Sequence, residues 1–81
     1  MLAATPGALN VLTQSDILTA LRRHLSGDWG DVPDDDKGAN DAALIYGHRL
    51  LSAYRSGCGT AFWIITEWDR SATTILLPSE Y

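Results

Sequence analysis

Six of the chain's ten acidic residues lie in one stretch, residues 26–41, with the sequence SGDWGDVPDDDKGAND. Lys37 is its single cation, so six carboxylates against one ammonium give this stretch a net charge of −5. Carboxylates at this density could hold a calcium ion or attract a cationic partner. We take the six acids and the tryptophan among them as candidate partner-binding residues: Asp28, Trp29, Asp31, Asp34, Asp35, Asp36 and Asp41.

The spacing of these acids does not match a calcium-binding loop of the EF-hand type. Such a loop needs oxygen ligands at alternate positions, glycine at the sixth and glutamate at the twelfth. With Asp34 as the first ligand, Gly38 falls fifth and Ile45 falls twelfth. No Cys or His stands at ligand spacing from His24 or His48, which we expect to be surface or capping groups. The sequence therefore predicts no metal and no cofactor.

Nucleophilic catalysis would need a serine or cysteine beside a base, and no spacing indicates one. Cys58 lies between two glycines in a predicted hairpin loop, without a histidine that the sequence couples to it. Glu67 and Asp69 could form a carboxylate pair, but the adjacent Arg70 favours a charged strand end and turn. We therefore expect a protein without enzymatic activity.

Length and composition predict one small domain over residues 1–81. An apolar content of 46% suits a chain that folds alone, and a lone cysteine excludes an internal disulfide. The opening MLAATPGALNVL lacks a basic start and is interrupted by Pro6, Gly7 and Asn10, so neither a signal peptide nor a membrane span is predicted. A net charge of −4 argues against direct nucleic-acid binding and favours a basic partner. The lone cysteine favours a cytoplasmic location.

Two helices are predicted ahead of the acidic stretch. Residues 2–5 could form a short strand, and Thr5-Pro6-Gly7 then predicts a short helix through Leu12, with threonine as the N-cap. Ser15 followed by Asp16 predicts the start of a clearer helix over residues 16–25, which Gly27 stops. Its expected inward stripe is Ile17, Leu18, Leu21 and Leu25.

The acidic stretch itself predicts a loop followed by a third helix. Pro33 begins this helix, and Asp34 to Asp36 fill its first turn, where each carboxylate stabilises the positive end of the helix dipole by roughly 0.3–1 kcal/mol. The helix should run to Tyr46 and stop at Gly47. Its expected inward stripe is Ala39, Ala42, Ala43 and Tyr46. Trp29 is predicted to plug the core, and the alternative is an interface anchor.

After Gly47 the apolar pattern changes from helical to alternating. Residues 49–54, 61–68 and 72–77 predict a three-stranded antiparallel meander, separated by RSGCGT and DRS. On the middle strand Phe62, Ile64 and Thr66 should face one way, and Trp63, Ile65 and Glu67 the other. The predicted fold is α+β, with two or three helices packed on a small three- to four-stranded antiparallel sheet. The second sheet face is either covered by the N-terminal segment or partly exposed.

Several segments also resemble a known group of proteins. ATPGAL, SGDWGD, GHRLLSAY, WIITEWDRSATT and LLPSEY are similar to the signature of a family of small proteins encoded on plasmids, phages and other mobile elements of Proteobacteria. Some members carry labels that name a restriction or modification subunit. Such a role does not fit here, because 81 residues cannot hold a methyltransferase fold and no glycine-rich cofactor loop follows a predicted strand.

The resemblance implies a setting in which small acidic proteins protect a mobile element from host defence, as anti-CRISPR proteins do. Many of these occupy the DNA-binding surface of a surveillance complex. Duplex DNA presents a charge about every 3.4 Å along each strand, and Asp34 and Asp41 should lie roughly 10 Å apart on one helix side. We predict a non-enzymatic inhibitor that binds a type I CRISPR (Cascade) surveillance complex through a DNA-mimicking surface. The alternative is a mobile-element accessory or regulatory protein that binds a partner without DNA mimicry, and an enzyme ranks third.

Overall fold

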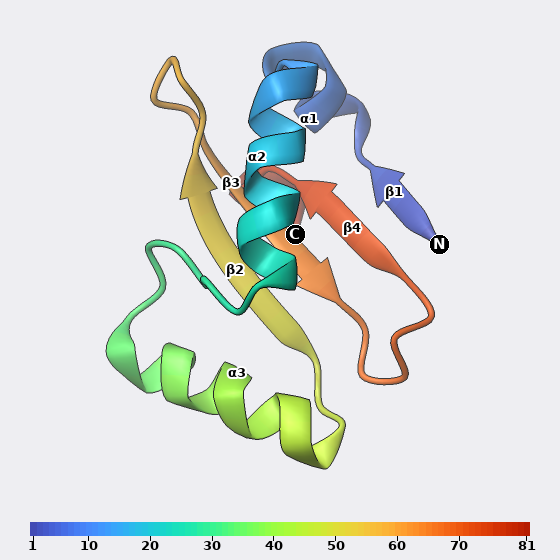
Figure 1. Ribbon diagram of the computed structural model, residues 1–81. Helices are drawn as coiled ribbons and strands as arrows, with labels where there is room; N and C mark the ends of the chain where they lie inside the picture. Colours follow the sequence, from blue (N-terminus) through green and yellow to red (C-terminus); the bar gives the residue numbers. More distant parts are fainter.

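The computed structural model describes all 81 residues as three α-helices and a 3-10 turn with a four-stranded sheet (Figure 1). In chain order the elements are β1 (Leu2–Ala4), α1 (Pro6–Val11), α2 (Gln14–Leu25), α3 (Asp34–Tyr46), β2 (Leu50–Arg55), β3 (Ala61–Thr66), β4 (Thr73–Leu76) and η1 (Pro78–Glu80). The strand order is β1-β4-β3-β2. The prediction of an α+β fold and of the meander is thus confirmed. None of the helices has the length and apolar composition to span a membrane.

The sheet is mixed, whereas the sequence predicted an antiparallel one. β2, β3 and β4 are antiparallel neighbours, but β1 lies parallel to β4, with Leu2 opposite Thr73 and Ala4 opposite Ile75. The Thr73 amide donates to the Met1 carbonyl at 2.8 Å, and the Thr5 amide donates to the Ile75 carbonyl at 3.0 Å. The difference arises because three helices and two strands separate β1 from β4 in the chain. A three-residue pattern does not specify so distant a partner.

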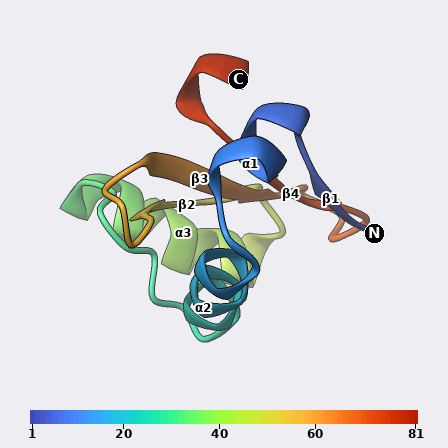
Figure 2. The same cartoon turned by 90° about the horizontal axis from the view of Figure 1, so that it is seen from above.

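The core lies between one face of the sheet and the N-terminal helices. Figure 2 shows α2 on one face and the C-terminal turn on the other. Phe62 and Ile64 on β3 and Ile75 on β4 are fully buried against this helical layer, as the alternation of β3 predicted. The other members of this cluster are Ala8, Leu12, Ala20 and Tyr54.

Helix α2 begins earlier and is rotated relative to the sequence prediction. Its N-cap is Thr13, not Ser15: the Thr13 hydroxyl accepts from the Asp16 amide at 3.0 Å, and the Asp16 carboxylate accepts from the Thr13 amide at 3.0 Å. This reciprocal pair satisfies two helix-end amides. The predicted stripe is wrong at Leu18 and Leu25, which are 46% and 81% exposed, because the helix buries Ala20 and His24 instead. The expectation of a surface or capping role for His24 is therefore also wrong.

Helix α3 ends as predicted, at Tyr46 before Gly47, whose left-handed φ is 75°. It begins at Asp34, one residue after the predicted start, and Pro33 is its N-cap. The predicted inward stripe is wrong at Ala39 and Tyr46, which are exposed, while Asn40 and Ala43 are buried. The cause is that α3 lies along the outer edge of β2 and packs through a narrow contact (Figure 1). The Asn40 amide group donates to the Leu51 carbonyl at 2.7 Å and accepts from the Leu51 amide at 3.1 Å.

The loop before α3 also forms hydrogen bonds to the outer edge of β2, as Asn40 does. The Ala53 amide donates to the Trp29 carbonyl at 3.1 Å, and the Ala53 carbonyl accepts from the Asp31 amide at 2.7 Å. Gly30 makes this approach possible, because a Cβ there would lie 2.0 Å from the Ala53 carbonyl oxygen. A side chain and a loop thus replace the missing fifth strand, which leaves little of the β2 edge free to pair with another chain.

The second face of the sheet is only partly covered, and the C-terminus covers it, not the N-terminal segment. Tyr81 packs edge-on against Trp63 with ring centroids 5.6 Å apart, and Ile65 is buried on this face. Glu80 anchors the turn, since its carboxylate accepts from the Leu77 amide at 3.0 Å and from the Gly7 amide at 3.1 Å.

Candidate acidic binding surface

Two of the six acids in the stretch serve the fold. Asp28 accepts from the Arg23 guanidinium at 2.7 Å and from the Gly30 amide at 3.2 Å. Mainly the hydrogen bond from Arg23, and secondly that from Gly30, lowers the pKa of the Asp28 carboxyl. Asp41 accepts from the indole N–H of Trp29 at 3.0 Å. Both carboxylates therefore hold the loop in place and have fewer lone pairs free for a partner.

Trp29 is a core plug, as the sequence predicted. It is 4% exposed, packs with Val32, Ala43 and Leu50, and stands edge-on to the His24 ring at a centroid distance of 5.7 Å. In this conformation its indole is not available to a partner. The Trp29 carbonyl and the Asp31 amide both bond to Ala53 on β2, so burial of Trp29 helps to fix the backbone that carries Asp31.

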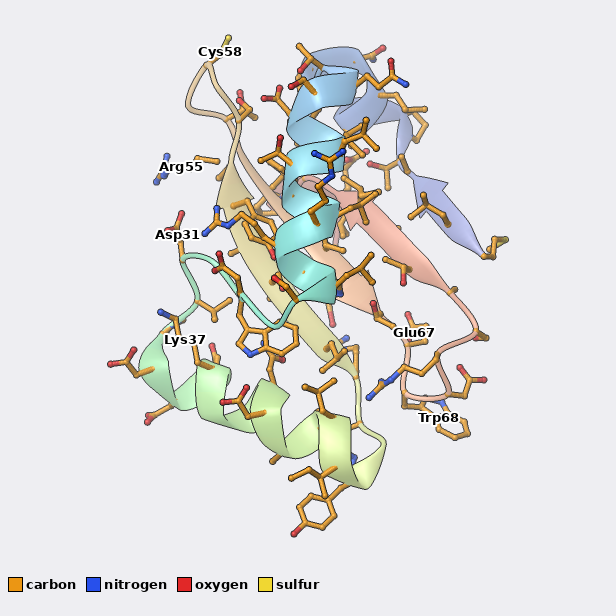
Figure 3. All side chains as sticks on the ribbon, in the orientation of Figure 1. Asp31, Lys37, Arg55, Cys58, Glu67 and Trp68 are labelled. Carbon is orange, nitrogen blue, oxygen red and sulfur yellow. The ribbon has the colours of Figure 1, made fainter.

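The remaining four carboxylates form what we call the acidic surface: Asp31, Asp34, Asp35 and Asp36. All four are exposed, and their side chains make no hydrogen bond within the protein. Their one ionic contact is a distant one, 4.0 Å between Lys37 Nζ and Asp34 Oδ1. Figure 3 shows Asp31 and Lys37 projecting from the same side of the molecule, far from Glu67 and Trp68. Such carboxylates stay hydrated and free to meet a cation.

The acidic surface stands on fixed backbone. The loop ahead of α3 is tied to β2 by two backbone hydrogen bonds through Ala53, and Val32 is buried. Asp34 to Asp36 occupy the first helical turn, where the dipole favours negative charge. Successive side chains of a helix point about 100° apart, so these three carboxylates spread around the start of α3 and give it a dense negative charge.

A buried polar network around His24 escaped the sequence prediction. One ring nitrogen contacts the Ser52 hydroxyl at 2.6 Å and the other contacts the Thr66 hydroxyl at 2.8 Å, which in turn meets Thr73 at 2.9 Å. The available signal was that Ser52 and Thr66 interrupt the apolar inward faces of β2 and β3. No carboxylate joins the network and Ser52 is fully buried, so it lacks both the acid and the access of a catalytic triad.

Burial lowers the pKa of His24, so the folded protein favours the neutral imidazole. The unfolded chain, with a histidine pKa of about 6.5, binds a proton more readily, and stability must therefore fall as pH drops below that value. We expect the Tm to decrease between pH 7.5 and pH 5.5, and a His24→Gln variant to lose this dependence. Thermal melts across the range test it. An equal pH dependence in His24→Gln would assign the effect to a group other than His24.

His24 lines an open cleft of about 490 Å³ between the C-terminal ends of α2 and α3, over the sheet. Its walls include Leu25, Leu44 and Leu50, and Arg70 lies at its rim. The Arg70 guanidinium is already engaged, because it donates to the carbonyls of His48 at 2.6 Å and Ala43 at 3.0 Å. Arg70 keeps its positive charge there, because backbone carbonyls are neutral, and the polar side chains of His24, Thr66 and Thr73 also line the cleft.

Glu67, Asp69 and Arg70, the other charged residues considered in the sequence analysis, lie in the turn between β3 and β4. Asp69 accepts from the Ser71 amide at 3.1 Å, and Arg70 adopts a left-handed φ of 63° in the same turn. The prediction of a charged turn at Glu67 to Arg70 is confirmed. No three His, Cys, Asp or Glu side chains lie close enough together to hold a metal ion.

Cys58 is exposed at the tip of the β2–β3 hairpin (Figure 3). We expect Cys58→Ser to leave folding and any partner binding unchanged, because the thiol makes no hydrogen bond and fills no buried space. Circular dichroism and the binding assay described below measure both quantities. A Cys58→Ser protein that folds normally but loses its function would show that the thiol takes part.

Comparison with other proteins does not extend this description: the chain matches no protein-family model, no curated protein and no solved structure.

Proposed function

We propose that this protein acts without catalysis, by presenting its acidic surface to a basic protein surface that otherwise binds DNA. The observation that carries the proposal is the division among the acids: Asp28 and Asp41 serve the fold, while Asp31, Asp34, Asp35 and Asp36 stand exposed on fixed backbone without hydrogen-bond partners. Like charges held together are unfavourable in the free protein. A cationic partner relieves that repulsion.

The partner we propose is the DNA-binding channel of a type I CRISPR (Cascade) surveillance complex, in the cytoplasm of a bacterium that carries it. The resemblance to proteins of mobile elements supplies this setting. The density of exposed carboxylates supports mimicry of DNA, because the cations of such a channel are placed to neutralise phosphates. The protein's net charge of −4 supports long-range attraction to the same surface.

A competition experiment tests the proposal directly. Purified surveillance complexes of several type I subtypes are mixed with labelled target duplex and increasing amounts of the protein. We expect displacement of the duplex from at least one subtype, and weaker displacement as salt rises, because exposed charge attraction is screened. In cells that carry the same subtype, targeted phage should regain plaque formation.

Two results would decide against this function. If no subtype binds the protein, the proposed partner is wrong. If a subtype binds the protein and still binds its target duplex, DNA mimicry is wrong, and the protein is instead an accessory or regulatory protein that acts by partner binding alone.

A further inference from the structure

The cleft between the C-terminal ends of α2 and α3 has the size and the apolar lining of a small-molecule site. Its volume of about 490 Å³ lies within the range of about 300–1,000 Å³ that is usual for such sites. Leu25 on α2 and Leu44 on α3 both line it and are 81% and 55% exposed, and the buried Trp29 and Leu50 complete the apolar part of the lining. No Asp or Glu lines the cleft, although the chain has ten acidic residues.

Arg70 brings to this cleft a positive charge that no carboxylate of the chain neutralises. Neither of the two ion pairs of the protein includes it. Its guanidinium is held instead by neutral acceptors, because Nη1 donates to the His48 carbonyl at 2.6 Å and Nη2 donates to the Ala43 carbonyl at 3.0 Å. These bonds hold the cation at the end of α3 and leave its charge in place.

Part of the guanidinium remains free to bind a ligand. The N–H group on Nε of Arg70 has no acceptor in the chain, and Nη2 uses only one of its N–H groups. Nε and Nη2 lie along one edge of the guanidinium, and such an edge binds a carboxylate through two parallel hydrogen bonds. The Thr73 hydroxyl lines the same cleft and has the Thr66 hydroxyl as its single partner, so it can also bond to a ligand.

We propose that this cleft binds a small organic anion with an apolar body, whose carboxylate pairs with Arg70 and whose apolar part lies between Leu25 and Leu44. The charge of the lining selects an anion, because Arg70 is its only ionised group: burial favours the neutral form of His24, the other titratable side chain there. The leucines select an apolar body over a fully hydrated ion such as phosphate.

The proposed site is separate from the acidic surface. Asp34, Asp35 and Asp36 occupy the first turn of α3, whereas the cleft lies at the opposite end of that helix, and Asp31 does not line it either. A ligand in the cleft therefore leaves all four carboxylates uncovered. The proposal does not depend on the proposed function.

The experiment uses octanoate as the probe and octan-1-ol as its uncharged counterpart of the same chain length. Each is titrated into the protein at neutral pH and followed by NMR correlation spectra, which report both affinity and the residues contacted. We expect octanoate to shift the Trp29 indole signal and the methyl signals of Leu25 and Leu44. Its dissociation constant should be on the order of 1 mM, which is reasonable for about ten non-hydrogen atoms.

A salt series tests the charge without any substitution. Because exposed charge attraction is screened, octanoate binding should weaken between roughly 50 mM and 500 mM NaCl, whereas octan-1-ol binding should not. In Arg70→Gln, which keeps N–H donors but loses the charge, the preference for octanoate over octan-1-ol should fall at least about threefold.

A matched pair of variants tests the apolar wall. Leu25→Glu places a carboxylate at the cleft and should weaken octanoate binding at least about threefold. Leu9→Glu makes the same change on α1, outside the lining, and should bind octanoate as wild type does. Both leucines are exposed, at 81% and 62%, so both variants should fold.

The proposal is overturned if octanoate causes no saturable shifts in the cleft, if salt leaves its binding unchanged, or if Leu25→Glu binds it as tightly as Leu9→Glu does. An unchanged preference for octanoate in a folded Arg70→Gln protein would also overturn it. The salt series and the leucine pair keep Arg70 intact, so they decide the question even where Arg70→Gln folds poorly. Arg70→Gln keeps every carboxylate, so DNA competition by a folded variant separately tests the proposed function.

Discussion

Ile64→Ala is expected to lower the free energy of unfolding by about 2–5 kcal/mol. Ile64 is fully buried at the centre of β3, opposite Ser52 on β2 and Ile75 on β4. Truncation removes apolar contacts and leaves a cavity that strands paired on both sides cannot easily close. A domain of this size has a total stability of only about 4–12 kcal/mol, so much of the variant should be unfolded or close to it.

Urea melts of three proteins measure this effect. Ile65→Ala removes a side chain from the opposite face of β3 that is 6% exposed, against 0% for Ile64, and should cost less than Ile64→Ala. Leu9→Ala removes an exposed side chain from α1 and should change stability by less than about 1 kcal/mol. If Ile64→Ala and Leu9→Ala destabilise the protein equally, β3 is not the centre of the core.

The sequence predicted those parts of the fold that local patterns determine. Pro33 and Gly47 flank α3: Pro33 is its N-cap, with the φ near −60° that its ring fixes, and Gly47 adopts the left-handed φ that ends the helix. The alternation of β3 likewise predicted its buried face. The features that the sequence did not predict depend on residues far apart in the chain. Strand β1 pairs with β4, and α3 lies against the edge of β2, where Asn40 is the inward residue.

The same limit applies to the candidate site. Charge density singled out the acidic stretch, but local sequence did not separate Asp28 and Asp41, which hold Arg23 and Trp29, from the four carboxylates that remain free. The His24 network escaped for a related reason, because it joins a helix to β2 and β3. The one indication in the sequence was that Ser52 and Thr66 occupy inward positions of their strands, where a polar side chain needs a buried hydrogen-bond partner.

Exchanging Asp31, Asp34 and Asp35 for Asn is expected to separate binding from folding. The variant loses three negative charges with little change in volume, and asparagine remains acceptable near a helix start. Stability should fall by at most the lost dipole interactions, roughly 0.3–1 kcal/mol for each helical acid, offset by reduced repulsion within the acidic surface. Affinity for the surveillance complex should fall by about tenfold or more, since lost attraction of about 1.4 kcal/mol corresponds to that factor.

The control is the double variant Glu67→Gln and Asp69→Asn, which removes two negative charges from the β3–β4 turn. Glu67 lies far from Asp31 (Figure 3). If attraction depended only on net charge, this control would lose most of the affinity that the triple variant loses. If the carboxylates occupy the positions of phosphates, only the triple variant should lose competition with target DNA, and its remaining binding should depend less on salt. If the triple variant competes like wild type across the salt series, the acidic surface is only a solvated helix start and takes no part in binding. Any inhibitory contact would then lie on the partly exposed sheet face around Trp63.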